Sequence, residues 1–366
     1  KNNVFKMQKT ILNSIHKALG AKMAPFGGYE MPIQYSGVKK EHLAVRNSVG
    51  IFDVSHMGEF IVKGSNALAL LQKVCSNDIA NIKIGKAQYN CFPNETGGII
   101  DDLIVYRIEE FKYFLVVNAS NIQKDWKWIS EWNKHFNAKI NNVSDQISLL
   151  AIQGPRAIEV AQNLSAANLN TLPNYSHITT SFAGKANVLI ATTGYTGSGG
   201  IEIYCKNDDV LKIWESVFNA GESCNIIPVG LAARDTLRIE MGYCLYGNEI
   251  NDDTSPIMAG LGWITRPSSG CINNKQFKNE KINGTEKRLV GIKILERGIP
   301  RSEYKIFSDL NIEIGFISSG THSPSLEIGI GLGYINSKYS IIGTQVYVEI
   351  RERKIKASIV KLPFVK

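Results

Sequence analysis

Two adjacent aspartates, Asp101 and Asp102, end the stretch NETGGIIDD that begins at Asn94. Side chains alternate between the two faces of a strand, so one aspartate should follow the isoleucines inward while the other meets water. Aspartate is depleted in strands, and a buried carboxylate is costly unless it has a partner. Two interpretations are open. Either both aspartates cap backbone amides at a turn, or one carboxylate faces a reaction site.

A glycine-rich loop leads into a strand that carries another carboxylate. The segment GYTGSGGIEIY begins at Gly194, and its four glycines allow the backbone to turn tightly and to approach a ligand. Glu202 lies between Ile201 and Ile203, so it points to the opposite face from both. A carboxylate there can accept two parallel N–H bonds from an arginine or from a guanidine-like heterocycle. A solvent-facing strand glutamate explains the same pattern.

Two arginines lie on a predicted helix that a proline and Gly242 bracket. Arg234 and Arg238 are one helical turn apart, and like charges at that spacing repel each other. An anionic partner for one of them would remove this conflict. Asp235 and Glu240 are candidates for that partner.

Motifs of several enzyme classes are absent from the sequence. It contains no His-Glu-x-x-His, no Gly-x-x-x-x-Gly-Lys-Ser/Thr phosphate loop and no Gly-x-Ser-x-Gly elbow. The six histidines are not paired at metal-ligand spacing, so no metal site is predicted, and His56 is expected to be a satisfied structural histidine. Gly329, Gly331 and Gly333 miss the dinucleotide-binding spacing, which favours turns of a β-barrel.

Strand and helix patterns alternate around these residues. Strands are predicted at 51–63 and 103–117, and helices at 66–73, at 210–218 and after Pro228. An aromatic stripe from Trp126 to Phe136 recurs at helical spacing, which favours core packing over a stacking site.

The residue pattern of the sequence changes near its C-terminal end. From Arg288 short strands are separated by Gly, Pro and Ser, and the period of two at 346–350 and 355–359 predicts a compact antiparallel barrel or sandwich of about 80 residues. A polar linker at 273–286 should precede it. With 366 residues and 44% hydrophobic content, two or three domains with substantial cores are expected.

Hydrophobicity, cysteine content and net charge limit the kinds of partner and environment that are expected. No apolar run reaches the roughly 18 residues that span a bilayer, and the first residues lack the features of a secretory signal, so no membrane association is expected. Six scattered cysteines without a Cys-x-x-Cys pair indicate reduced intracellular thiols. The net charge of +8 comes from singly spread lysines without an arginine-rich arm, which favours a solvated basic surface over a nucleic-acid site.

Taken in order, these segments and several others closely resemble the aminomethyltransferase family, the T-proteins of the glycine cleavage system. The resemblance covers nearly the whole chain. Its motifs include FGGYEMP from Phe26, FDVSHMG from Phe52, NETGGIIDD, AIQGP from Ala151, GYTG from Gly194, GLAARDTLR from Gly230, LGW from Leu261, RGIPR from Arg297, SSGTHSPSL from Ser318 and KLPFV from Lys361.

The resemblance implies an α+β, three-domain, cloverleaf-like fold around a central tetrahydrofolate channel. Residues 1–270 would form two interleaved α+β domains and residues 287–366 the C-terminal antiparallel β-barrel. It also implies the reaction. A lipoyl carrier protein presents an aminomethyl group on sulfur, and the enzyme releases ammonia and transfers the one-carbon unit to tetrahydrofolate, which gives methylenetetrahydrofolate.

Site residues follow from the same resemblance. The family's essential aspartate matches Asp102, which would stabilise the iminium-like cation, orient the folate nitrogens and, as a further option, transfer a proton. Its pterin-contacting glutamate matches Glu202 and its arginine matches Arg234. Other folate-pocket positions match Tyr89, Val117, Asn118, Tyr195 and Trp263. The glycine loop departs from the family pattern at Ser198, where many members have Glu.

Two alternatives share the fold, which does not by itself fix the chemistry. One is a folate-dependent demethylase that would transfer a methyl group. The other is a non-catalytic folate-binding protein of iron–sulfur cluster assembly, which carries a Lys-Gly-Cys-Tyr-x-Gly-Gln-Glu stretch that is missing here. The folate's anionic tail and an acidic carrier would both suit the positive net charge. A bacterial cytoplasm is expected in preference to a mitochondrial matrix.

Overall fold

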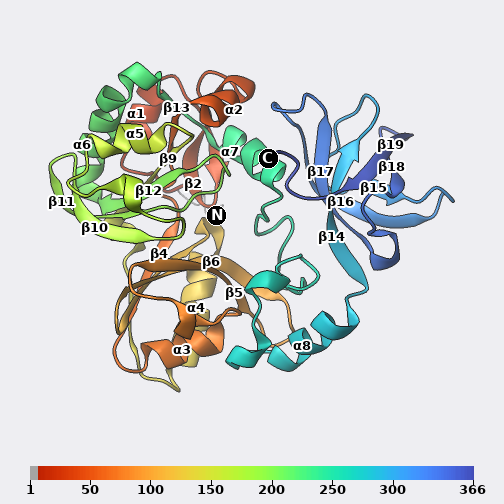
Figure 1. The fold of residues 1–366 in the computed structure, drawn as a ribbon, viewed down its shortest axis with the longest axis horizontal. Helices are drawn as coiled ribbons and strands as arrows, with labels where there is room; N and C mark the ends of the chain where they lie inside the picture. The colour runs from red at the N-terminus through yellow and green to blue at the C-terminus, as the bar shows by residue number, and fades with distance from the viewer. Residues whose placement is uncertain (1–6) are drawn as a thin grey trace, which may run out of the picture.

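The computed structural model describes residues 7–366, which form three lobes around a common centre (Figure 1). One lobe contains a six-stranded sheet, the second a five-stranded sheet, and the third a closed barrel. This α+β arrangement with a C-terminal barrel is the fold class that was predicted. Within residues 7–366 every helix is too short or too polar to pass through a lipid bilayer.

The six-stranded sheet is built from strands far apart in the chain. Its order is β10 (His177–Phe182), β11 (Lys185–Ala191), β12 (Gly200–Lys206), β9 (Ile147–Gln153), β3 (Gly50–Asp53) and β13 (Ile227–Pro228). Its helices are α1 (Asn13–Ala18), α2 (Val38–Asn47), α5 (Ala157–Gln162) and α6 (Asn207–Ala220). Ile201 and Ile203 of β12 are fully buried in one core cluster with Trp214 of α6. The face that carries these isoleucines is therefore the helix-covered face.

The five-stranded sheet is antiparallel throughout. Its order is β5 (Lys86–Pro93), β6 (Ile99–Glu109), β7 (Lys112–Val117), β4 (Gly58–Lys63) and β8 (Lys139–Asn142), with helices α3 (Ala67–Val74) and α4 (Ile122–Asn133). Ile129 of α4 is fully buried, and Trp126, Trp132 and Phe136 pack against the same core. The prediction that the aromatic stripe serves core packing is confirmed.

A third core joins the two sheets. It contains Phe52 of β3, Leu149 of β9 and Tyr204 of β12 together with Tyr106 of β6 and Val116 of β7. A hairpin of β1 (Lys22–Phe26) and β2 (Tyr29–Gln34) adds to it. The faces of the two sheets that bear these side chains are consequently held together by apolar packing.

Helix α7 (Leu231–Met241) packs against the hairpin, against α2 and against the barrel strands β16 (Glu313–His322) and β17 (Gly329–Asn336). Gly242 ends it with φ of +71°. The irregular segment that follows leads to α8 (Asn274–Asn283). Most of the predicted polar linker is therefore helical. Its single buried side chain, Phe277, anchors the helix to the molecule and stabilises it despite its polar composition.

The barrel closes in the order β14 (Lys287–Ile294), β17, β16, β15 (Lys305–Phe307), β18 (Gln345–Ile350) and β19 (Arg353–Val360). Buried residues such as Ile292, Ile317 and Val348 fill it, so the predicted antiparallel barrel is confirmed. The placement of three glycines in turns was wrong. Gly331 and Gly333 lie within strand β17, where a Cβ would approach backbone oxygens of β16 to 2.8 Å and 2.6 Å.

Arg238 ties helix α7 to the barrel through buried polar contacts. Its side chain is 1% exposed. Nη1 donates to Glu249 Oε2 at 2.6 Å, and Nη2 donates to Ser319 Oγ of β16 at 2.8 Å. Glu249 is also fully buried and accepts a hydrogen bond from Ser318 Oγ at 2.7 Å. Barrel and helix are thus joined through Ser318 and Ser319 of β16, which bond the two members of one buried ion pair.

The two acidic candidates on the helix have different partners. Asp235 accepts from Arg238 Nε at 2.8 Å, as the spacing allowed. Glu240 instead accepts from Arg46 at 2.9 Å and lies 3.1 Å from His42 Nε2. The helix therefore neutralises Arg238 but supplies nothing comparable for Arg234.

Replacing the buried arginine should cost much of the protein's stability. Arg238→Met leaves Glu249 as an uncompensated buried charge, so the free energy of unfolding should fall by about 3–5 kcal/mol. Urea denaturation followed by circular dichroism measures it. The matched control is Arg156→Met, which breaks an exposed i,i+3 pair with Glu159 and should leave stability nearly unchanged. Equal, small losses in both variants would contradict the structural role of Arg238.

Candidate active site

A cavity of about 630 Å³ lies where the three lobes meet. Its walls come from β6 and β7 of one sheet, β9 and β12 of the other, helix α7, and Leu289 and Leu362 of the barrel lobe. Of the eight residues predicted for the site, seven line it: Tyr89, Asp102, Asn118, Tyr195, Glu202, Arg234 and Trp263. Val117 is the exception, because its side chain packs in the core beneath the five-stranded sheet, and Val116 lines the cavity instead.

Asp102 faces this cavity from strand β6. It accepts hydrogen bonds from Tyr89 Oη on the neighbouring strand β5 and from Asn118 Nδ2 at the end of β7, both at 2.8 Å. Burial and the nearby charge of Asp101 together raise the pKa of Asp102 to about 7, against the lowering effect of the two hydrogen bonds. Near neutral pH this carboxyl group therefore exists in both protonation states.

Asp101 points to the opposite side of the strand and is fully buried. It accepts three N–H bonds: from the Asn118 backbone at 2.9 Å, from Asn118 Nδ2 at 2.9 Å and from Asn121 Nδ2 at 2.6 Å. These bonds fasten the turn after β7 to β6. One aspartate of the pair thus fixes backbone and amides while the other lines the cavity.

The two glycines of NETGGIIDD serve the packing of another segment. A Cβ at Gly98 would overlap the carbonyl of Asp252, and Gly97 has φ of +93°. Asn94 Nδ2 donates to Asp252 O at 2.7 Å, and Ile99 N donates to Asn251 O at 3.0 Å. Gly98 therefore admits the segment that follows α7, and Gly97 faces the side chain of Gln276 on α8.

Glu202 faces the cavity from β12, on the face opposite to Ile201 and Ile203. Thr193 Oγ1 and Tyr204 Oη donate to its Oε2, at 2.5 Å and 3.4 Å. Within residues 7–366 no group donates to Oε1. One oxygen is thus held by the protein while the other is free to accept from a ligand.

The glycine loop before β12 is fastened at the position where it departs from the family pattern. Ser198 Oγ accepts from Arg46 Nη1 at 2.7 Å. A Cβ at Gly197, whose φ is +68°, would overlap the side chain of Met241. The loop therefore packs against the end of helix α7, and the serine is part of that contact.

Arg234 is the cation of the cavity. Its guanidinium lies over the ring of Tyr195, with 4.4 Å between the guanidinium carbon and the ring centroid. The described residues form neither a hydrogen bond nor an ion pair with it. Tyr195 in turn donates to the carbonyl of Cys244 and stacks on Tyr243 at 5.7 Å. A cation held by an aromatic ring keeps its N–H groups for a ligand.

Aromatic rings also mark one side of the cavity. Tyr89 and Trp263 lie 6.0 Å apart between centroids, and Trp263 is 60% exposed, so a ligand can contact both rings. His56 is buried between Phe26 and Tyr29. The expectation that it is a satisfied histidine is wrong, because its Nδ1 has no hydrogen-bond partner among residues 7–366. Burial lowers the pKa of His56 to about 4.

Several residues that line the cavity or support its walls were not predicted. Tyr204 and Thr193 hold Glu202, and Tyr243 supports Tyr195. Tyr204 had a signal in the sequence, because it lies two residues after Glu202 and so on the same face of the strand. No group of three His, Cys, Asp or Glu side chains with metal-binding geometry occurs in residues 7–366.

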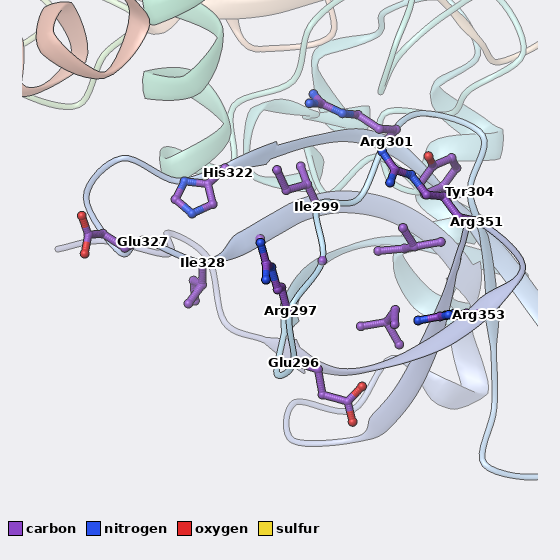
Figure 2. Close-up of a pocket in the computed structure, with 14 residues that line it drawn as sticks. Glu296, Arg297, Ile299, Arg301, Tyr304, His322, Glu327, Ile328, Arg351 and Arg353 are labelled. Atoms are coloured by element: carbon purple, nitrogen blue, oxygen red, sulfur yellow. The ribbon is translucent and has the colours of Figure 1, made fainter.

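A second cavity, of about 940 Å³, belongs to the barrel alone (Figure 2). Arg297, Arg301, Arg351 and Arg353 project around it, and all four are exposed. None of the predicted site residues lines this cleft. The converging carboxylates, the arginine and the aromatic rings lie in the central cavity, which is therefore the candidate active site.

Comparisons with known proteins agree with this geometry. Residues 12–268 match the family model described as the GCVT N-terminal domain, and residues 287–366 match the glycine cleavage T-protein C-terminal barrel domain. The aminomethyltransferase of Flavobacterium psychrophilum is 53% identical over 98% of this chain and 100% of its own. That of Bacteroides fragilis is 53% identical over 98% and 99%.

A solved structure is similar along the whole chain. The crystal structure of the glycine cleavage system aminomethyltransferase T from Bartonella henselae superimposes with a TM-score of 0.92 at 34% identity, covering 98% of both chains. Fold, cavity and relatives thus point to one family. The chain belongs to the aminomethyltransferases, the T-proteins of the glycine cleavage system.

Proposed function

We propose that this aminomethyltransferase moves the one-carbon unit of an S-aminomethyl-dihydrolipoyl carrier protein to tetrahydrofolate, with release of ammonia. The observation that carries the proposal is the convergence of Asp102, Glu202 and Arg234 on one cavity. In this reaction the C–S and C–N bonds of the aminomethyl group break and two C–N bonds to folate form. Two folate N–H protons leave with the thiol and ammonia, so no oxidant is needed.

Asp102 is the proposed catalytic residue. Loss of ammonia places positive charge on the transferred carbon and its neighbour, and a carboxylate inside a protein-walled cavity stabilises such charge more than it would in water. Tyr89 and Asn118 hold the carboxylate in one orientation. Its pKa near neutrality also suits it to accept a proton from a folate nitrogen.

Glu202 and Arg234 are the proposed folate-binding pair. The unoccupied Oε1 of Glu202 can accept from the amino-pyrimidinone edge of a pterin. Arg234 supplies N–H donors for carbonyl or carboxylate oxygens, and Tyr89 and Trp263 offer ring contacts for the aromatic parts of folate. The net charge of +8 suits both the anionic folate tail and an acidic carrier. A bacterial cytoplasm is the proposed location, supported by the bacterial relatives.

The first test is the complete reaction. Purified protein, tetrahydrofolate and aminomethyl-loaded carrier should yield ammonia and methylenetetrahydrofolate, and Asp102→Asn should lower kcat by at least about a hundredfold through loss of a transition-state charge contact. Asp101→Asn is the matched control and should cost less. No ammonia above the carrier's own decay would refute the proposed function. A large loss in Asp101→Asn alone would move the catalytic role to Asp101.

The pH dependence should report the ionisation of Asp102. Because its pKa is raised to about 7, the fraction of ionised carboxylate, and with it kcat/KM, should fall as the pH decreases below about 7. Asp101→Asn removes the neighbouring charge that raises this pKa, so the acid limb should move to lower pH. Steady-state kinetics over the pH range measures both. An acid limb at the same pH in Asp101→Asn would contradict the electrostatic coupling.

Folate affinity should depend on Glu202. Glu202→Ala removes the acceptor for the pterin edge, so the Kd for tetrahydrofolate should rise by about tenfold or more, equivalent to roughly 1.4 kcal/mol or more. Glu202→Gln keeps an acceptor and the side-chain shape but loses the charge, and its Kd should lie between those of Glu202→Ala and the wild type. Isothermal titration calorimetry provides the values. Unchanged affinity in Glu202→Ala would make this residue a structural strand glutamate.

A further inference from the structure

A third carboxyl group, Asp125, lies behind the aspartate pair. It belongs to the first turn of helix α4 and is fully buried. It follows by four residues Asn121, whose side chain donates to Asp101, and so lies next to that carboxyl group. Within residues 7–366, no N–H or O–H donor other than a carboxyl group reaches either of its oxygens. Nothing in the proposed reaction uses this residue. A buried ionised carboxylate without donors is costly, so its chemical state needs an explanation.

The three carboxyl groups differ in the number of hydrogen-bond donors that reach them. Asp101 receives three N–H bonds, Asp102 receives one O–H and one side-chain N–H bond, and Asp125 receives none. Donors stabilise the charged form of a carboxyl group, so the negative charge belongs on the group that has most of them. Three charges in this small volume would also repel one another strongly.

We infer that Asp125 carries a proton at neutral pH and donates it in a hydrogen bond to Asp101, which makes Asp125 a positioning residue for Asp102. The inference rests on the function proposed for Asp102. The link between them is Asn118. Its Nδ2 carries two hydrogens, and these reach Asp101 Oδ1 at 2.9 Å and Asp102 Oδ1 at 2.8 Å.

This arrangement fixes the orientation of the cavity carboxylate. The Asn118 amide cannot flip, because its oxygen would then face two carboxyl oxygens. The orientation of the Asn118 amide depends on a negative charge on Asp101. The O–H group of Asp125 and the side-chain N–H of Asn121 stabilise that charge. The hydrogen-bonded series thus runs from helix α4 to the cavity, in the order Asp125, Asp101, Asn118 and Asp102.

Other charged groups near this hydrogen-bonded series do not replace the O–H donor of Asp125. Lys124 precedes Asp125 but directs its Nζ to Tyr246 Oη at 2.5 Å and to Asp252 Oδ2 at 3.3 Å. Near Asp102 the titratable groups are Tyr89, Cys91, Cys244, Tyr195 and Arg234. Of these only Tyr89 donates to it. Burial raises the pKa of Asp125 well above its ordinary value, in agreement with a protonated group.

Infrared spectroscopy tests the location of the proton without any turnover. At about pH 8 exposed carboxyl groups are ionised, so the C=O stretch of a protonated carboxyl group reports only buried ones. The wild-type spectrum should contain such a band that Asp125→Asn lacks. Glu59 is the matched control, because it is also fully buried with both oxygens unpartnered among residues 7–366. Glu59→Gln should remove a different band and leave the Asp125 band in place.

Kinetics tests the positioning role. Asp125→Asn keeps the shape and an N–H donor to Asp101, so it should preserve kcat and the pH profile. Asp125→Leu keeps the approximate shape but has no donor, so kcat should fall by about tenfold or more as Asp102 loses its fixed orientation. Asp101 would then ionise only at higher pH, and the acid limb set by Asp102 should move to lower pH. Ile129→Ala, one turn later on α4, should lower stability without moving that limb.

The outcomes separate this inference from the proposed function. An infrared spectrum of Asp125→Asn identical to that of the wild type would overturn the assignment of the proton, whether or not the protein is active. Equal kcat and equal acid limbs in Asp125→Leu and the wild type would overturn the positioning role. If Asp125→Leu does not fold, the infrared comparison of Asp125→Asn still decides. Absence of the overall reaction in wild-type protein counts against the proposed function alone.

Discussion

A buried ion pair joins Arg238 of helix α7 to Glu249 in the segment that follows it, and α7 contacts both the six-stranded lobe and the barrel. Neither charge can lose its partner without a large penalty. Ser319 and Ser318 of β16 bond Arg238 and Glu249, so the pair also fixes the barrel against the helix. Arg234 lies one turn earlier on the same helix and reaches the central cavity. The repulsion between the two arginines is therefore resolved unequally. Arg238 is neutralised by buried partners, whereas Arg234 lines the cavity and lies over the ring of Tyr195.

The same electrostatic rule organises the carboxyl groups around the cavity. Each acidic group takes the state that its hydrogen-bond donors can support: Asp101 is saturated with N–H bonds, Asp102 has fewer donors, and Glu202 has one occupied oxygen. Among these three, the two that line the cavity have fewer donors than Asp101. Asp101 and Asp102 thus differ in the number of their donors, although they are neighbours on strand β6.

Local patterns in the sequence predicted the features that depend on neighbours along the chain. Alternation placed Glu202 opposite Ile201 and Ile203, and the period of two revealed the barrel. Features that depend on distant residues were not predictable. Gly98 of NETGGIIDD makes room for Asp252, and helix α8 is anchored by Phe277, whose burial involves the rest of the molecule. The choice of Asp102 over Asp101 came from the family resemblance, since Asn118, which bonds both carboxyl groups, lies in the turn after another strand, β7.

The membership of β3 in the six-stranded sheet has a consequence for synthesis on the ribosome. All strands of the five-stranded sheet lie between residues 58 and 142, so that sheet can form from a continuous nascent segment. Strand β3 is made just before it but pairs with β9 and β13, whose residues follow up to Pro228. Strand β3 therefore cannot complete its pairing until β9 and β13 have been synthesised. The lobes therefore mature in a different order from the order in which their first strands are translated.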